Sequence, residues 1–368
     1  MRTLATTTAF AAFLAGCTGG ERRPALPTVP QVYVVDNEDG TISVLDPMLQ
    51  ARAALIQLTV EHGGQYDPYT PFGIAVSPRD GTIWVAAPPG VVYSRTRIGV
   101  DAGAATPFED WQTRVADQLV VVDPATHDVS RRINIQDAAY VHFLAFDRAG
   151  DYVYATEYDL HDVVQVDART YRIASHIDLG EGRRPLGIAA CGGRVYVANE
   201  GSDSLSTIDP ATSNVTETQL PSAPWFVTCT PDARYLFVTL FVPHQVLRIE
   251  RATGATTTIQ LPPESQGPAD LLVSPNGQTL LVCDHGHERL RPDSNLVFDI
   301  DVENAVVRGS IVVGRGAHSV AFSRDGATAY VTNRFERSIS IVDVARRQVT
   351  GTIATGRRPT GVVVWNPP

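Results

Sequence analysis

The sequence predicts an all-β fold, a seven-bladed β-propeller of four-stranded antiparallel blades, and three observations support this prediction. Residues 329–343 form a hairpin pattern in which apolar and polar side chains alternate on both sides of a polar turn. An aromatic or apolar residue in the first strand and an acidic residue thirteen positions later recur along the chain. Further strands before and after each hairpin give units of roughly 40 to 45 residues, which is the period of propeller blades.

The hairpin has seven copies. Five are compact, and their residue pairs are Tyr33 with Asp46, Tyr154 with Asp167, Tyr196 with Asp209, Phe237 with Glu250, and Tyr330 with Asp343. In two copies an insertion separates the pair, which is Trp84 with Asp123 and Leu281 with Asp301. Because one blade cannot bury both of its faces, the copies must stack around a common axis.

Turn residues separate the strands of each unit. An innermost strand comes before the hairpin, and at 72–81, 270–277 and 318–326 it ends in Asp-Gly or Asn-Gly, which supplies the positive φ of a tight turn. The closing acid begins the next turn, where its carboxylate accepts hydrogen bonds from nearby backbone N–H groups. A fourth, outer strand follows, as at 348–356.

The two ends of the repeat region predict how the ring closes. The first unit begins at Gln31 and lacks an innermost strand, whereas the last unit is followed by a spare one at 359–367. The C-terminal strand therefore completes the first blade, which removes both free sheet edges.

The N-terminus has the features of a targeting segment, so we divide the chain into 1–16, 17–30 and 31–368. Residues 4–14 are apolar but too short to span a bilayer, and Leu14-Ala15-Gly16-Cys17 resembles a bacterial lipobox. That resemblance implies a lipoprotein signal peptide, a lipidated Cys17 that anchors the protein to a membrane, and a Gly/Pro-rich tether before the propeller. Thr18 in place of Asp favours the outer membrane, facing the periplasm or the cell surface. The alternative is an ordinary cleaved signal.

Composition excludes one class of partner and limits the redox chemistry. The formal charge of −10 argues against nucleic acid, whose binding needs clustered basic residues. Cys191, Cys229 and Cys283 each stand alone in a strand-like run, without a CxxC or zinc spacing. We expect buried free thiols, with one disulfide as the alternative in an oxidising envelope compartment.

Three segments carry a family resemblance. Residues 329–333 (AYVTN), 195–199 (VYVAN) and 32–36 (VYVVD) resemble the YVTN repeat of seven-bladed β-propellers, and the resemblance covers about 31–367. Proteins with this repeat include surface-layer and cell-envelope proteins and relatives of lactonases and of the nitrous oxide reductase propeller. The resemblance therefore implies the fold and leaves the activity open.

Propeller geometry places one set of loops on a common face, which we call the top face. It carries the loops after the first hairpin strands and before the innermost strands, and both insertions, about 88–116 and 285–294, lie on it. Loops carry function more often than strands do, so we expect a binding surface on this face.

Seven of the nine histidines map to the top face: His62, His142, His161, His244, His285, His287 and His318. His142 and His318 begin innermost strands, where a ring completed by Phe72, Leu186, Trp225, Ala269 and Thr360 should face the central channel. Arg184, Arg315 and Arg358 precede innermost strands and could hold an anionic ligand, or form salt bridges with the acidic top loops. Asp284, His285 and His287 are the candidate metal ligands.

The sequence contains no GxSxG elbow, phosphate-binding glycine loop or haem motif, and we assign no catalytic residue and no defined cofactor. The predicted ring is apolar over half of its circumference, which weakens the case for an enzyme. We therefore predict a non-catalytic cell-envelope lipoprotein that binds a protein, a glycan or a small ligand through its top face. The alternative is a lactonase-like or metal-dependent enzyme with its site at the top of the channel.

Overall fold

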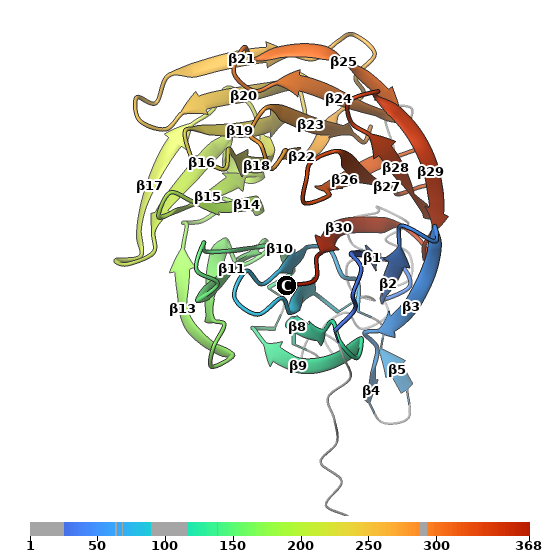
Figure 1. The fold of residues 1–368 in the computed structure, drawn as a ribbon. Coiled ribbons are helices and arrows are strands. Elements are labelled where there is room, and N and C mark those ends of the chain that lie inside the picture. Colours follow the sequence, from blue (N-terminus) through green and yellow to red (C-terminus); the bar gives the residue numbers. More distant parts are fainter. Residues whose placement is uncertain (1–25, 63–64, 68, 90–115, 138, 287–292) are drawn as a thin grey trace, which may run out of the picture.

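A computed structural model describes residues 26–368 apart from 63–64, 68, 90–115, 138 and 287–292. The predicted signal peptide, Cys17, His287 and most of the 88–116 insertion lie outside the described residues. The described part contains seven four-stranded antiparallel sheets arranged in a ring (Figure 1). The predicted seven-bladed propeller is therefore confirmed.

Four strands make up each blade, named below from the innermost to the outermost. Blade 1 is β30 (Pro359–Trp365), β1 (Gln31–Asp36), β2 (Thr41–Asp46) and β3 (Ala51–Gln57). Blade 2 is β6 (Ile74–Val76), β7 (Ile83–Ala87), β8 (Gln118–Asp123) and β9 (Asp128–Asn134). Blade 3 is β10 (Val141–Phe146), β11 (Tyr152–Glu157), β12 (Asp162–Asp167) and β13 (Arg172–Asp178).

The remaining blades repeat this order. Blade 4 is β14 (Pro185–Cys191), β15 (Arg194–Asn199), β16 (Ser204–Asp209) and β17 (Asn214–Gln219), with a short 3₁₀ turn, η1 (Glu200–Ser202). Blade 5 is β18 (Pro224–Cys229), β19 (Tyr235–Leu240), β20 (Gln245–Glu250) and β21 (Thr256–Gln260). Blade 6 is β22 (Pro268–Val273), β23 (Thr279–Asp284), β24 (Leu296–Asp301) and β25 (Val306–Val312). Blade 7 is β26 (Ala317–Phe322), β27 (Thr328–Asn333), β28 (Ser338–Asp343) and β29 (Gln348–Ala354). A separate hairpin joins β4 (Val60–His62) to β5 (Gln65–Asp67).

The ring closes as the sequence predicts. β30 pairs antiparallel with β1, so that Gln31 lies opposite Trp365 and Asp36 opposite Pro359. Trp365 is 2% exposed and packs in the same apolar cluster as Tyr33. Blade 1 is therefore built from both ends of the propeller region.

The core lies between neighbouring blades, because each blade has two apolar faces to cover. The cluster between blades 7 and 1, for example, joins Tyr330 and Ile339 to Val32 and Val362. The closing acids hold the turns that follow them, as predicted. Asp343 accepts a hydrogen bond from the Arg346 N–H at 2.9 Å, and Asp167 accepts one from the Arg169 N–H at 2.8 Å.

The cysteines depart from the expectation of free thiols. A disulfide joins Cys191 to Cys229, while Cys283 is free and buried, which raises the pKa of its thiol well above the ordinary value. Cys191 and Cys229 end the innermost strands of adjacent blades, and their Cα atoms lie 6.7 Å apart, within disulfide range. In the described residues no helix has the length and apolarity needed to cross a membrane.

Deleting residues 358–368 should destabilise the whole propeller, because it removes the innermost strand of blade 1 and the buried Trp365. We expect a loss of more than about 5 kcal/mol in the free energy of unfolding, since removing one buried Trp side chain alone costs about 3–5 kcal/mol. Thermal unfolding followed by circular dichroism measures the effect, with deletion of only residues 366–368 as the control. Equal melting temperatures for the two truncated chains would show that β30 is not the closing element.

Candidate functional site

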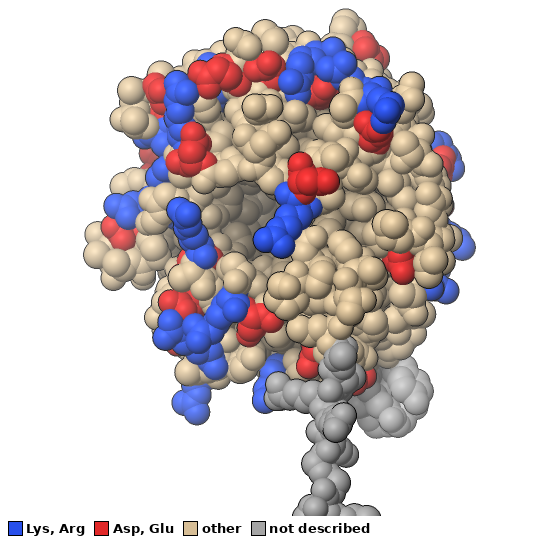
Figure 2. All heavy atoms as spheres, viewed as in Figure 1, with Lys and Arg blue, Asp and Glu red and all other residues tan. Residues whose placement is uncertain are grey.

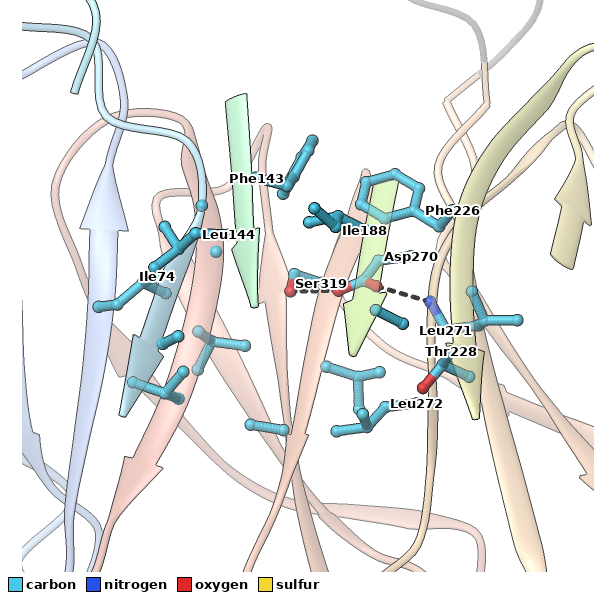
Figure 3. A pocket seen from close by; sticks show the side chains of 18 of the residues that line it. Ile74, Phe143, Leu144, Ile188, Phe226, Thr228, Asp270, Leu271, Leu272 and Ser319 are labelled. Carbon is cyan, nitrogen blue, oxygen red and sulfur yellow. Dashed lines mark hydrogen bonds between the residues drawn. The ribbon is translucent and has the colours of Figure 1, made fainter. Parts of the chain in front are cut away.

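The innermost strands enclose a channel cavity of about 410 Å³. Its wall is mainly apolar, and Figure 3 shows side chains from several blades around it. The apolar part includes Ile74, Phe143, Leu144, Ile188, Phe226 and Leu272. Three polar side chains interrupt this wall, those of Thr228, Asp270 and Ser319. A cavity of this size with few polar groups is typical of a small-molecule site.

Asp270 and Ser319 form the polar contact inside this cavity (Figure 3). The Ser319 hydroxyl donates to Asp270 Oδ2 at 2.6 Å, and the Leu271 N–H donates to Oδ1 at 2.8 Å. Burial raises the pKa of Asp270 to about 6, although these hydrogen bonds oppose the shift. At neutral pH the channel therefore holds one carboxylate whose ionisation is costly and which a donor or cation on a ligand would stabilise.

The face that carries the C-terminus is hollowed near its centre (Figure 2). Acidic and basic side chains are interspersed around the rim of this face, without a region of one sign covering it.

The predicted ring lies in the predicted register but does not line the channel cavity. Val141 lies opposite Glu157 and Ala317 opposite Asn333, so His142 and His318 occupy equivalent positions in blades 3 and 7. The cavity wall begins one residue later in six innermost strands and two residues later in blade 4, at Ile188. Ala269 and Thr360, two further members of the ring, are fully buried.

Aromatic side chains surround the ring positions. The His142 ring is 5% exposed and lies 4.4 Å from Phe72 and 4.3 Å from Tyr140 between ring centroids. Trp225 stacks on Phe241 at 4.1 Å. Side chains from different blades therefore pack against one another at the predicted channel mouth, where Phe72 and Trp225 stay partly exposed.

The structure brings two of the top-face histidines into contact. The rings of His285 and His318 lie 5.2 Å apart, and His285 Nδ1 lies 2.7 Å from the Gly286 carbonyl. Burial lowers the pKa of His318 well below its ordinary value, and the nearby Arg334, His285 and His142 act in the same direction. His318 is therefore neutral at pH 7, the form that can accept a proton or bind a metal.

The three candidate arginines do not converge. Arg184 lies over the Tyr158 ring at 6.0 Å, Arg315 pairs with Glu336 at 3.2 Å and Asp293 at 3.5 Å, and Arg358 lies 3.7 Å from Glu38. This arrangement matches the salt-bridge interpretation more closely than a shared anion site.

The candidate metal ligands of blade 6 are only partly described. The Asp284 carboxylate accepts hydrogen bonds from the Ser265 hydroxyl at 2.7 Å, the Gln266 N–H at 2.8 Å and the Gly267 N–H at 3.0 Å. These bonds hold the loop before β22. Because His287 lies outside the described residues, a metal bound by Asp284, His285 and His287 stays a prediction.

Sequence reasoning missed a cluster at the top of blade 3. Among the described residues, Glu157, Asp162 and His176 have ligand atoms within 4.8 Å of one another. Burial raises the pKa of Glu157 to about 7 and that of Asp162 to about 8, and a hydrogen bond to Glu157 together with its charge adds to the second shift. An alignment of the seven copies could have revealed this cluster. The residue five positions after the end of the second strand is Asp162 in blade 3, whereas it is Thr or Ser in blades 1, 4 and 7.

A second cavity, of about 900 Å³, lies between blades 3, 4 and 5 beside the Cys191–Cys229 disulfide. The two carboxylates in its wall accept hydrogen bonds from backbone N–H groups of the turns to which they belong. Asp147 Oδ1 accepts from the Asp151 N–H at 2.9 Å, and Asp232 Oδ1 accepts from the Arg234 N–H at 3.0 Å. Arg148, Arg194 and Gln165 also line this cavity, so its wall carries more charged side chains than that of the channel and suits an apolar ligand less well.

Comparison with known proteins supports the fold. A sequence model of YNCE-like beta-propellers matches residues 112–367. No curated protein matches the sequence. Hydrazine synthase from Kuenenia stuttgartiensis has a similar solved structure, with 18% identity, a TM-score of 0.63 and coverage of 80% of this chain and 89% of that one.

Two further solved structures are similar. Virginiamycin B lyase from Staphylococcus aureus has 15% identity and a TM-score of 0.60, covering 79% of this chain and 87% of the lyase. A functionally unknown protein from Desulfotomaculum acetoxidans has 14% identity and a TM-score of 0.66, covering 92% and 99%. At these identities the likeness concerns the fold alone.

The raised pKa of Asp270 predicts a pH-dependent effect of Asp270→Asn. The folded protein holds the Asp270 proton more tightly than the unfolded chain does, so ionisation between about pH 4 and pH 6 costs stability. The variant cannot ionise, and we expect it to be more stable than the wild type at pH 8 by roughly 1–3 kcal/mol, with no gain at pH 4. Urea unfolding at both pH values measures this.

The control is Asp325→Asn, since Asp325 is an exposed turn carboxylate whose pKa is lowered by hydrogen bonds from Ser323 and Ala327. It should give no stabilisation at pH 8. A gain for Asp270→Asn that is equal at pH 4 and pH 8 would show that ionisation of Asp270 is not the cause.

Proposed function

The chain belongs to the YNCE-like beta-propeller family, and from that premise we propose that it is a non-catalytic binding protein that takes a small, largely apolar ligand into its central channel. One observation supports this most directly: the cavity of about 410 Å³ has an apolar wall with one carboxyl group, that of Asp270. Its size falls within the range of about 300–1,000 Å³ that small-molecule sites occupy.

The chemistry of the wall defines the ligand class. Phe143, Phe226 and the aliphatic residues favour an apolar body, because burying apolar surface contributes about 25 cal/mol per Å². Asp270 and Ser319 favour a hydroxyl or amine on that body, which would donate to the carboxylate. The proposed binding site is therefore the channel, whereas the sequence led us to expect a binding surface on the top face.

We further propose that the protein acts in the bacterial envelope, tethered through lipid on Cys17. The lipobox-like Leu14-Ala15-Gly16-Cys17 and the following Gly/Pro-rich segment support this. A membrane fraction that retained a Cys17→Ser protein as strongly as the wild type would contradict it.

Catalysis in the channel is the second candidate function. The pKa of Asp270, near 6, suits a group that gives and takes protons at neutral pH. Structural neighbours include enzymes, among them a catalytically inactive histidine-to-alanine variant of virginiamycin B lyase solved with quinupristin. A ligand that wild-type protein converts and Asp270→Asn does not would favour this candidate over simple binding.

A channel-filling variant tests the binding proposal. Leu272→Trp adds an indole inside the channel, and Leu55→Trp makes the same change on the exposed outer strand β3. Compounds from a library of small organic molecules that raise the melting temperature of the wild type should do so equally for Leu55→Trp and should lose the effect with Leu272→Trp. At a concentration of 100 times Kd the stabilisation should be about 2.7 kcal/mol.

Thermal shift across the library is the measurement, with the affinity of each hit then determined by calorimetry. Replacing Asp270 by Asn should weaken binding of the amine or hydroxyl hits about tenfold, the cost of about one hydrogen bond. Compounds that stabilise the Leu272→Trp variant as much as the wild type would place their site outside the channel.

A further inference from the structure

We propose that the top of blade 3 binds one divalent transition-metal ion through Glu157, Asp162 and His176. These residues come from three adjacent strands, β11, β12 and β13. They are not among the residues that line the channel cavity, and they are separate from the His285–His318 pair.

The other blades show what usually occupies this position. In blade 7, Asn333 Nδ2 donates to the Ser338 and Ser340 hydroxyls at 2.9 and 3.0 Å. In blade 4, Asn199 Nδ2 donates to the Ser204 and Ser206 hydroxyls at 3.0 and 2.8 Å. In blade 1, Asp36 Oδ2 accepts from the Thr41 and Ser43 hydroxyls at 2.9 and 2.7 Å. In blades 1, 4 and 7 the last side chain of the second strand is thus bonded to two hydroxyl groups of the third strand.

Blade 3 replaces this network with carboxylates. Glu157 ends the second strand, and its partner in register is Asp162, where the other three blades have Thr or Ser. Val164 stands in place of the second hydroxyl. Glu157 is fully buried, and apart from the neighbouring carboxyl group its Oε1 and Asp162 Oδ1 have no hydrogen-bond partner among the described residues. Two neighbouring carboxylates can both be satisfied only by sharing a proton or a cation.

His176 supplies a third ligand of suitable type. Its Nδ1 lies 2.9 Å from Glu157 Oε2 and 3.7 Å from Asp162 Oδ2. Metal–ligand bonds of about 2.0–2.2 Å place tetrahedral ligand atoms at separations of this order. The Gln136 amide also lies 2.9 Å from this nitrogen, and an ion bound to Nδ1 would replace that contact.

The local charge favours a cation. Asp178 lies opposite Asp162 in the register of β12 and β13, so a further carboxylate adjoins the cluster. Within the described chain, His176 is the sole basic side chain within 4.0 Å of either ligand carboxylate. The His176 side chain is 33% exposed, so an ion can reach the cluster from solvent.

The ligand set indicates the class of metal. One imidazole nitrogen and two carboxylates suit Zn²⁺ and similar first-row divalent ions, whereas Ca²⁺ takes six to eight oxygen ligands. Three protein ligands leave a fourth position for water or another small ligand.

The test uses the full chain, stripped with EDTA and titrated with ZnCl₂ by calorimetry at pH 7.5. We expect one equivalent of Zn²⁺ to bind, because one ligand atom from each of the three side chains lies within reach of a single ion. Glu157→Gln/Asp162→Asn and His176→Gln should each weaken binding by at least about 100-fold.

Two further variants separate metal binding from folding. Glu157→Asn/Asp162→Ser restores the side chains found in blades 4 and 7 and should fold with a normal melting temperature while losing Zn²⁺ binding. The matched control is Asp36→Asn, which makes a carboxylate-to-amide change at the equivalent position of blade 1 and should bind Zn²⁺ like the wild type.

Three outcomes would overturn the proposal. One is a wild-type protein that binds no Zn²⁺. Another is binding that survives in folded Glu157→Asn/Asp162→Ser. The third is binding that is lost in His285→Ala but kept in His176→Gln, which would place the ion beside the channel instead.

Discussion

The pairing of β1 with β30 is the interaction on which the rest of the structure depends. It joins Gln31 to Trp365 and Asp36 to Pro359 in one sheet, so the two ends of the propeller region become neighbours. Without it, blade 1 would expose an unpaired edge, and the apolar layer between blades 7 and 1 would lose Val362. The channel exists because this closure holds the innermost strands in a ring.

A second constraint acts at the top of each blade, where the second strand ends among buried neighbours and polar groups must be paired. Blades 1, 4 and 7 meet it with hydroxyl groups, and blade 6 meets it with loop N–H groups around Asp284. In blades 2 and 5 no polar side chain needs a partner at this position, because the second strand ends in the apolar residues Ala87 and Leu240. Blade 3 instead concentrates negative charge there, and this departure from the repeat is what suggests a function.

The sequence was sufficient for the strands, the turns and the closure, because each follows from a repeated pattern of apolar and turn residues. It also aligned His142 with His318 correctly. It did not reveal the aromatic packing around His142, because Phe72 and His142 belong to different blades and no single hairpin shows such a contact. The Cys191–Cys229 pair depends on the distance between adjacent blades, which no single hairpin reveals. The His176 contact depends on the register between β12 and β13, which contains another shift.

The proposed metal site depends on the departure of blade 3 from the common pattern at Glu157, Asp162 and His176. Diffraction from crystals soaked in Zn²⁺, recorded at the zinc absorption edge, tests it most directly. We expect a strong anomalous peak about 2.0–2.2 Å from one atom of each of these side chains. A peak beside His285 and His318, or the lack of any peak at blade 3, would contradict the claim.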